Sequence, residues 1–91
     1  MQFEWDEAKA FQNLARHGVD FVDASAVFED PLRLELQDER YEYGEMRVRA
    51  IGIVQGVLLV VVFTYREDTI RIISARKAER HERRAYYESH R

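Results

Sequence analysis

The sequence predicts an α+β fold with two short helices, a four-stranded antiparallel meander and a C-terminal helix. Apolar residues recur at helical spacing ahead of Pro31, the single proline, which is a residue that stops helices. Strand-like runs joined by short polar turns follow it. Residues 57–63 are apolar on both alternating faces, so we expect this run to be a central strand that is covered on both sides.

The N-terminal part of the chain carries signals for a short strand and two helices. Residues 3–5 alternate in polarity, which is consistent with a short edge strand. The first helix is expected between Asp6, a good N-cap, and Gly18. Its expected apolar face consists of Ala8, Phe11, Leu14 and Ala15. The second helix follows Asp20. Its expected apolar face consists of Phe21, Ala24, Val27 and Phe28. We also expect Trp5 and Phe11 to lie in the core.

The remaining strands and the last helix follow from alternation and turn residues. Leu32, Leu34 and Leu36 alternate with polar residues and predict a strand with one buried face. Residues 46–54 and 69–76 predict the two neighbours of the central run. Gln55-Gly56 and Glu67-Asp68 are the expected tight turns. A helix is expected at about residues 77–89, and its apolar content is so low that weak packing is predicted.

Composition points to a globular chain in a reducing compartment. The 91 residues fit one domain, which we place at 1–91, with 46% apolar and 34% charged residues. There is no cysteine, and the N-terminus has no signal-peptide pattern, so a cytoplasmic protein without membrane association is expected. The net charge of −3 divides unevenly: residues 1–45 have a balance of −8, and residues 46–91 have one of +5. The basic half is suited either to a polyanion or to the acidic half of the same fold.

The chain contains no strong enzyme motif. The three histidines, His17, His81 and His90, lack metal-ligand spacing, so neither a metal nor another cofactor is expected. What remains is a cation-rich surface with tyrosines and histidines close to it in sequence. Cleavage of RNA without metal needs little more, because the ribose 2′-hydroxyl supplies the nucleophile. Arginine suits the phosphate charge and histidine suits proton transfer.

Short segments spread over nearly the whole chain carry a family resemblance through their order and spacing. In order, they are Phe3-Glu4-Trp5-Asp6, Lys9 with Asn13, Arg16-His17-Gly18-Val19-Asp20-Phe21 and Ala24, Glu39-Arg40, Gly44-Glu45-x-Arg47, Ile51-Gly52, Val61-Val62-Phe63-Thr64, the string from Ile70 to Ala78, Glu82-Arg83 and Tyr86. Together they resemble the BrnT family of toxins from bacterial type II toxin–antitoxin systems.

The resemblance implies a RelE-like fold, a ribonuclease that inhibits translation, and a protein partner. The partner would be a BrnA-type antitoxin with a ribbon-helix-helix DNA-binding part, whose dimer bridges two toxins. DNA would then be bound only through the antitoxin.

The resemblance also implies site residues by position. The catalytic candidates are His17, Arg66, Arg76 and Tyr86. His17 would transfer protons, Arg66 and Arg76 would stabilise phosphate charge, and Tyr86 would stack on a base or position a group. Glu82 is expected to orient an arginine. The RNA-binding candidates on the basic surface are Arg71, Lys77, Arg80 and Arg83.

Each candidate has a structural alternative. His17 can cap its helix, Arg71 can pair with an acid, and antiparallel pairing does not by itself bring Arg66 and Arg76 together. Two functional alternatives stay open as well. One is a non-catalytic interaction module or inactive toxin that acts in operon regulation with its partner. The other is direct DNA binding, which is weaker because no recognition-helix pattern is visible.

Overall fold

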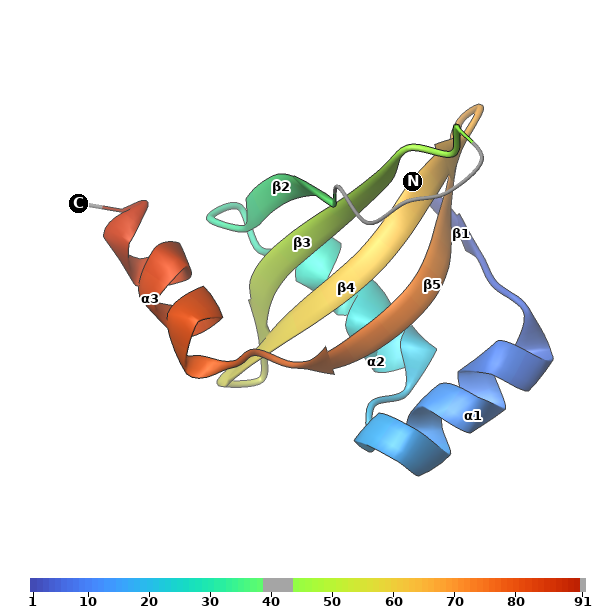
Figure 1. Cartoon of the computed structure of the whole chain (residues 1–91), viewed down its shortest axis with the longest axis horizontal. Helices are drawn as coiled ribbons and strands as arrows, with labels where there is room; N and C mark the ends of the chain where they lie inside the picture. The colour runs from blue at the N-terminus through green and yellow to red at the C-terminus, as the bar shows by residue number, and fades with distance from the viewer. Residues whose placement is uncertain (39–43, 91) are drawn as a thin grey trace.

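The computed structural model of the chain describes residues 1–38 and 44–90, and it has the predicted α+β architecture (Figure 1). Its elements are β1 (Gln2–Glu4), α1 (Glu7–His17), α2 (Phe21–Ser25), the 3-10 helix η1 (Ala26–Glu29), β2 (Leu34–Asp38), β3 (Arg47–Val54), β4 (Val57–Arg66), β5 (Thr69–Lys77) and α3 (Arg80–Glu88). The strands form a five-stranded sheet in the order β1-β5-β4-β3-β2. No helix in the described part of the chain is long and apolar enough to span a membrane.

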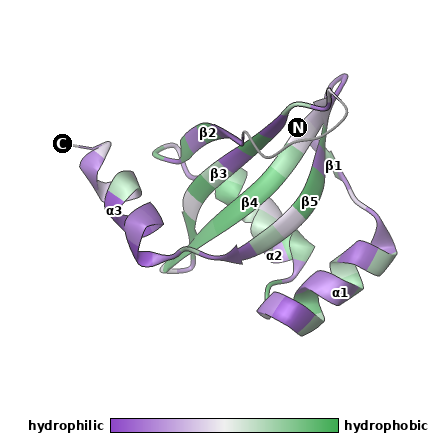
Figure 2. Cartoon of the chain, viewed as in Figure 1, coloured by the Kyte–Doolittle hydropathy of each residue, from purple (hydrophilic) through white to green (hydrophobic). Residues whose placement is uncertain are grey.

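Strand β4 lies at the centre of the sheet, as its two apolar faces predict. It pairs antiparallel with β3 on one side and with β5 on the other. Leu59, Val61 and Phe63 belong to one hydrophobic cluster, and Leu58 and Val60 belong to another. Figure 2 shows that the ribbon of β4 is hydrophobic along most of its length. The strand therefore contributes to a cluster on each face of the sheet.

Strand β1 adds a parallel edge to the antiparallel meander. Residues 3–5 were expected to form an edge strand, and the observed strand lies one residue earlier in the chain. Phe3 pairs with Ile70, and Glu4 pairs with Arg71. Because β1 pairs only with the first residues of β5, the outer edge of β5 beyond Arg71 must find other hydrogen-bond partners.

The two predicted turns have the backbone conformation that tight hairpins require. Gln55 and Gly56 both have positive φ, at 49° and 82°, as a two-residue type I′ turn demands. Glu67 also has a positive φ, of 57°, in the turn between β4 and β5. These turns fix the register that sets which side chains share a face.

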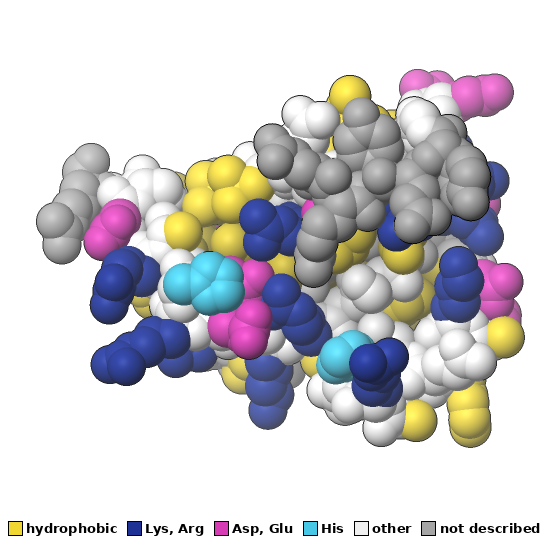
Figure 3. Space-filling view, in the orientation of Figure 1, with side chains coloured by type: hydrophobic (Ala, Val, Ile, Leu, Met, Phe, Trp, Pro, Cys, Tyr) yellow, Lys and Arg dark blue, Asp and Glu magenta, His cyan; other side chains and the backbone are white. Residues whose placement is uncertain are grey.

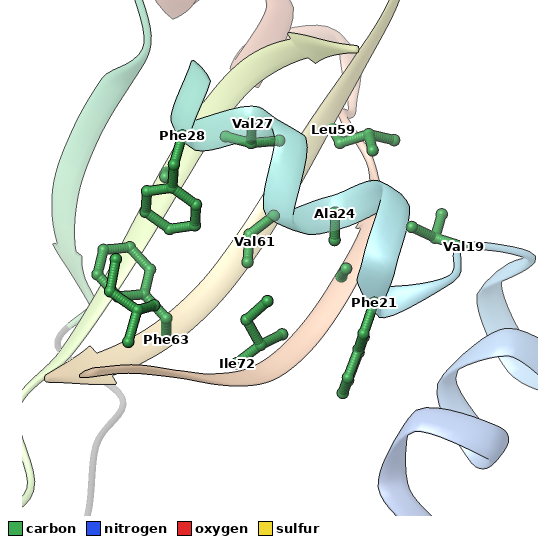
Figure 4. Close-up of a cluster of buried hydrophobic side chains, with 12 residues drawn as sticks. Val19, Phe21, Ala24, Val27, Phe28, Leu59, Val61, Phe63 and Ile72 are labelled. Atoms are coloured by element: carbon green, nitrogen blue, oxygen red, sulfur yellow. The ribbon is translucent and has the colours of Figure 1, made fainter. Parts of the chain in front are cut away.

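Helices α2 and η1 cover one face of the sheet. Phe21, Ala24, Val27 and Phe28 are buried there against β4 and β5, which confirms the predicted apolar face (Figure 4). Asp20 caps α2 by accepting a hydrogen bond from the Val22 amide at 2.7 Å.

Helix α1 turns an unexpected side towards the sheet. Asp6 and Gly18 cap it as predicted. However, the predicted apolar face is exposed, and the core assignment of Phe11 is wrong because its side chain is 76% exposed. The buried residue of the helix is Asn13, which bonds to the backbone of β5. Trp5 is half-buried and packs against the core cluster, with its ring 5.9 Å from that of Phe21.

Helix α3 covers part of the opposite face of the sheet. It begins at Arg80, three residues later than predicted, because β5 continues to Lys77. Ala78 and Tyr86 are buried in a cluster with Ile51, Leu58 and Val60. Within α3 itself the buried residues are Glu82 and Tyr86. The apolar packing of this helix is therefore small, as predicted, and hydrogen bonds of these two side chains add to its attachment.

Strand β2 is shorter than the leucine alternation predicts. It begins at Leu34, and Leu32 lies before it with an exposed side chain. The sequence also predicts a polar loop after this strand that contains Tyr41 and Tyr43, and these two residues lie outside the described ones.

Gly52 permits the close approach of η1 to the sheet, which gives a first prediction. A Cβ at this position would lie 2.8 Å from Val27 Cγ1 and 3.1 Å from the Val27 carbonyl oxygen. Gly52→Ala is expected to destabilise the fold by about 1–3 kcal/mol in urea unfolding, because side chain and backbone must both shift. Val57→Ala, at an exposed position of β4, is the control and should change stability by less than about 1 kcal/mol. Equal losses of stability in Gly52→Ala and Val57→Ala would contradict a close approach of η1 to Gly52.

Candidate functional site

Five arginines lie on the face of the sheet opposite α2. Antiparallel partners share a face, and the register places Arg49 beside Val62, Arg71 beside Thr64, and Arg76 beside Val60. The complete set is Arg47 and Arg49 on β3, Arg66 on β4, and Arg71 and Arg76 on β5. Figure 3 shows lysine and arginine side chains spread over this side of the molecule.

Each of these five arginines lies within 4.0 Å of a carboxylate. Arg71 pairs with Glu4 at 3.0 Å, as its alternative reading predicted. Arg47 and Arg66 approach Glu45 at 3.4 and 4.0 Å, and Arg49 and Arg76 pair with Glu82. Intramolecular acids therefore neutralise much of the arginine charge on this face.

The sheet places Arg66 and Arg76 near opposite ends of the same face. Arg66 pairs with Thr69, whereas Arg76 pairs with Val60. Six residues of β4 separate these points, which corresponds to about 20 Å along a strand. The two guanidinium groups therefore do not converge on one phosphate.

Glu82 is the centre of a cluster at the α3 end of the sheet. Its side chain is only 2% exposed, and its two oxygens accept hydrogen bonds from Arg76 Nη1 and Nη2 at 2.7 and 2.8 Å. Arg49 Nη1 lies 3.4 Å away, and the Glu79 amide donates at 2.7 Å. Burial alone would raise the pKa of Glu82, but these bonds and the charge of Arg76 outweigh it and lower the pKa. The position agrees with the expectation that Glu82 orients an arginine.

The hollow beside Glu82 carries as many acids as bases. Asp38, Glu79 and Glu82 line it together with Arg49, Arg76 and His81. Glu79, His81 and Glu82 bring possible metal ligands within 4.8 Å of one another. Both oxygens of Glu82 are already bonded to arginine, and a cation there would face two guanidinium groups. This cluster therefore suits the anchoring of α3 better than it suits a metal or a phosphate.

Tyr86 is a buried anchor of α3. Its side chain is 4% exposed, and its hydroxyl donates to Asp30 Oδ2 at 2.6 Å. Asp30 also accepts from the amides of Leu32 and Ile53, at 2.8 and 2.9 Å. Burial raises the pKa of Asp30, but these three hydrogen bonds outweigh it and lower the pKa. Tyr86 has no open ring face, so the expectation that it stacks on a base does not fit this conformation.

A second polar cleft lies between α1 and β5, and Asn13 fixes its shape. The Asn13 amide nitrogen donates to the carbonyl oxygens of Ala75 and Val19 at 2.8 and 3.0 Å, and its oxygen accepts from the Ala75 amide at 3.1 Å. Asn13 thus satisfies the edge of β5 that β1 leaves unpaired. Residues three and four positions away on the same helix face necessarily lie beside β5 as well.

That cleft, which we call the α1–β5 cleft, contains the sequence candidate His17. It has a volume of about 260 Å³. Its lining residues are Lys9, Gln12, Asn13, Arg16, His17, Ile73 and Ser74. None of these described lining residues is acidic, and no ion pair among the described residues involves Lys9 or Arg16. In contrast to the hollow beside Glu82, the α1–β5 cleft therefore has a basic lining whose positive charge no described acid neutralises.

The α1–β5 cleft adjoins the arginine face through β5. Ser74 pairs with Val62 and Arg76 with Val60, so both side chains lie on the same face. Two residues of a strand separate them, which is about 7 Å. Arg76 is therefore a sheet arginine close to the cleft along β5, on the side towards α3. Its guanidinium is held by Glu82, but the Nε–H and one Nη2–H bond to no other described residue.

The three remaining basic candidates lie at the surface beyond this region. Lys77, Arg80 and Arg83 are exposed at the end of β5 and on α3. Arg83 Nη1 donates to the Ala78 carbonyl oxygen at 2.8 Å. They lie on the α3 side of Arg76 and not in the α1–β5 cleft.

A comparison with protein-family models gives the family. Residues 5–82 match the model described as the ribonuclease toxin, BrnT, of type II toxin–antitoxin systems. The chain belongs to the BrnT family. Membership implies ribonuclease activity and a cognate antitoxin. A comparison with curated proteins found no match. The match includes His17, Arg66, Arg76 and Glu82, and it ends before Tyr86.

Sequence reasoning missed several residues of the BrnT chain's clefts. Lys9 and Arg16 were not among the site candidates, although Lys9, Asn13, Arg16 and His17 have the spacing of one helical face. Period-two alternation within residues 46–54 does predict that Arg47 and Arg49 share one face of the strand, and the structure places them so. Nothing local could show that Arg49 and His81 lie together, because 32 residues separate them in the sequence.

Replacing Glu82 should give a pH-dependent loss of stability. Glu82→Gln leaves Arg49 and Arg76 without their carboxylate, so we expect a loss of about 1–3 kcal/mol at pH 7 in urea unfolding. Because folding lowers the pKa of Glu82 from its ordinary value of 4.5, its contribution is present above that pH. It is lost as the pH falls through the lower value, so the two proteins should converge in acid. Glu88→Gln, on the exposed end of α3, is the control. A difference in unfolding free energy between the native chain and Glu82→Gln that stays the same from pH 7 into acid would contradict the role of the Glu82 carboxylate.

Removing the Tyr86 hydroxyl should change the alkaline limit of stability. Tyr86→Phe takes a hydrogen bond from buried Asp30, so a loss of about 1–2 kcal/mol is expected at pH 7. Burial, followed by the bond to Asp30 and its charge, raises the pKa of Tyr86 from 10.0 to about 12. The native chain should therefore keep this contribution below pH 10 and lose it as the pH rises towards 12. In urea unfolding between pH 7 and 11, the free energy of unfolding should decrease less for Tyr86→Phe than for Tyr87→Phe.

Proposed function

We propose that this BrnT-family chain is an endoribonuclease that inhibits translation by cutting RNA without a metal ion, and that it holds the scissile phosphate in the α1–β5 cleft. The observation that carries the proposal is the lining of that cleft. It brings a lysine, an arginine and a histidine together with a serine hydroxyl, and none of its described lining residues carries a carboxylate. A phosphate prefers such a site to the Glu82 cluster, where acids already occupy the arginines.

The reaction we propose uses the ribose 2′-hydroxyl as the nucleophile. His17 accepts the 2′-hydroxyl proton while the 2′-oxygen forms a bond to phosphorus. The bond from phosphorus to the 5′-oxygen breaks, and that oxygen takes a proton from a water molecule, which in turn takes the proton held by His17, so that the histidine returns to its neutral form. The products are a 2′,3′-cyclic phosphate and a 5′-hydroxyl. Lys9 and Arg16 stabilise the additional negative charge of the phosphorane.

The other candidate residues extend this site into a binding track. Arg76, the next basic side chain along β5, binds the neighbouring phosphate with its remaining donors, and Glu82 orients it. Arg71, Lys77, Arg80 and Arg83 contact the RNA backbone on either side. Arg66 acts in binding rather than in catalysis because of its distance from Arg76 along β4. Tyr86 supports the site by positioning α3.

The biological setting we propose follows the family. The chain acts in the cytoplasm as one domain over residues 1–91. A BrnA-type antitoxin with a ribbon-helix-helix part neutralises it, and the antitoxin dimer bridges two toxins. Operator DNA is bound through the antitoxin. These assignments rest on membership of the BrnT family, which implies a cognate antitoxin.

The test is cleavage of a defined RNA by the purified chain in the presence of EDTA. His17→Ala is expected to slow cleavage by about 10²- to 10⁴-fold, because a positioned proton acceptor is lost. Arg16→Ala is expected to slow it by about 10²-fold, because one phosphate donor is lost. Arg84→Ala, an exposed arginine of α3 outside the proposed track, is the control and should cleave as the native chain does. Mapped ends should be a 2′,3′-cyclic phosphate and a 5′-hydroxyl.

Two outcomes would overturn parts of this proposal. Cleavage that EDTA abolishes and added Mg²⁺ restores would contradict the metal-independent mechanism. Full activity of folded His17→Ala would remove the α1–β5 cleft as the catalytic site. Thermal unfolding of each variant separates a local effect from a loss of fold.

One observation favours the second candidate function, a non-catalytic interaction module. All five sheet arginines already pair with acids of the same chain, so less of their positive charge is available to bind RNA. Expression of the chain alone separates the two functions. Growth arrest with RNA cleavage, relieved by the antitoxin, supports the toxin. Stable complex formation without arrest or cleavage supports the module.

A further inference from the structure

The side of α1 that faces away from the α1–β5 cleft exposes large apolar residues beside α2. Phe11, Leu14 and Val22 are 76%, 46% and 62% exposed. Together with Trp5, Ala10 and Phe21 they line a groove of about 400 Å³, which we call the α1–α2 groove. The two helices that form it lie next to each other in Figure 1. Figure 3 shows exposed apolar side chains at the lower right of the molecule.

These exposed side chains contribute little to the fold. Helix α1 is held to the sheet by Asn13, and Ala10 is its half-buried apolar contact with the core. Phe11 and Val22 project from their helices with most of their surface open. Single exposed apolar residues are ordinary, but several that line one groove mark a surface that another molecule covers.

The charged residues that line the α1–α2 groove are acidic. Glu7 and Asp20 complete its lining, and no lysine, arginine or histidine is among the described lining residues. Asp6, the N-cap of α1, and Asp23, next to Val22 in α2, are exposed as well. A second copy of this chain would bring the same acids face to face in a two-fold interface, which is unfavourable. The groove is instead complementary to apolar side chains flanked by basic ones.

The groove suits a helix rather than a strand. It lies between two helices, so it offers no strand edge to which an extended segment could hydrogen-bond. Recognition must therefore come from side chains, as when an amphipathic helix places its apolar face in a groove.

We propose that the α1–α2 groove is a docking surface for a basic amphipathic helix of the cognate antitoxin. The proposal rests on the proposed function for the identity of the partner, and it adds the surface and the chemistry of the contact. Phe11, Leu14 and Val22 form its apolar contact, and Glu7 and Asp20 pair with basic residues of the partner. The helix that carries His17 on one side thus binds the antitoxin on the other side.

The first experiment measures affinity between the native chain and the purified product of the reading frame next to its own, by calorimetry. Phe11→Ser with Val22→Ser is expected to weaken binding by at least about 10-fold, and these exposed changes should leave the fold intact. Leu32→Ser, at an exposed apolar residue outside the groove, is the matched control and should bind as the native chain does. Equal affinity of the double variant and the native chain would overturn the proposal.

A second pair of variants tests the charge complementarity. Glu7→Gln with Asp20→Asn removes both acids, and asparagine preserves the N-cap of α2. Binding should weaken, and its dependence on salt concentration should become shallower. An unchanged salt dependence would contradict a basic partner. If the native chain formed dimers that Phe11→Ser made monomeric, the occupant would be a second copy and the proposal would be wrong.

RNA cleavage by the same variants separates this proposal from the proposed function. Phe11→Ser with Val22→Ser should cleave RNA at the native rate and should no longer be neutralised by the antitoxin in cells. A chain that binds the antitoxin through the groove but cuts no RNA would overturn only the ribonuclease mechanism. A ribonuclease whose neutralisation is unaffected by the double variant would overturn only the docking surface. Absence of any complex with the native chain would overturn the docking surface as well.

Discussion

The side chain of Asn13 provides the interaction on which the functional arrangement of this molecule depends. It bonds to both backbone groups of Ala75 and to the Val19 carbonyl oxygen, so it closes the edge of β5 that β1 does not reach. Burying those groups unpaired would cost about 1–3 kcal/mol each. The same contact sets the rotation of α1 about its axis. One side of α1 therefore forms a cleft with β5, and another side carries Phe11 and Leu14 at the surface.

The distribution of charge divides the surface into three regions with different chemistry. The sheet arginines lie next to Glu4, Glu45 and Glu82, so their charge mainly stabilises the fold and orients donors. The α1–β5 cleft has bases and no acids among its described lining residues, which makes it the favourable place for a phosphate. The α1–α2 groove has the opposite sign. Lys9 and Arg16 of the cleft and Glu7 and Asp20 of the groove all belong to residues 1–45, so the charge difference between the two halves of the sequence does not account for these two surfaces.

Local patterns in the sequence predicted the elements of the fold well. The doubly apolar run at residues 57–63 became the central strand, and Asp6, Gly18 and the two hairpin turns act as predicted. The orientation of α1 was not predictable in this way, because Asn13 bonds to Ala75, 62 residues further along the chain. Helical periodicity favoured the side of α1 that carries Phe11 and Leu14 as the buried one. The unpaired edge of β5 instead faces the side that carries the amide of Asn13. The pairing of Glu82 with two arginines likewise depends on strand register.

The most direct test of the account is to locate RNA on the folded chain. A short RNA with one 2′-O-methyl group at the scissile position cannot supply the nucleophile, so it can be titrated into the labelled protein and followed by NMR. If the scissile phosphate lies in the α1–β5 cleft, the largest changes should fall on His17, Ser74 and the other residues of this cleft, with smaller changes at Arg76. Changes confined to the Arg66 end of the sheet, or to the outer side of α3, would contradict this placement.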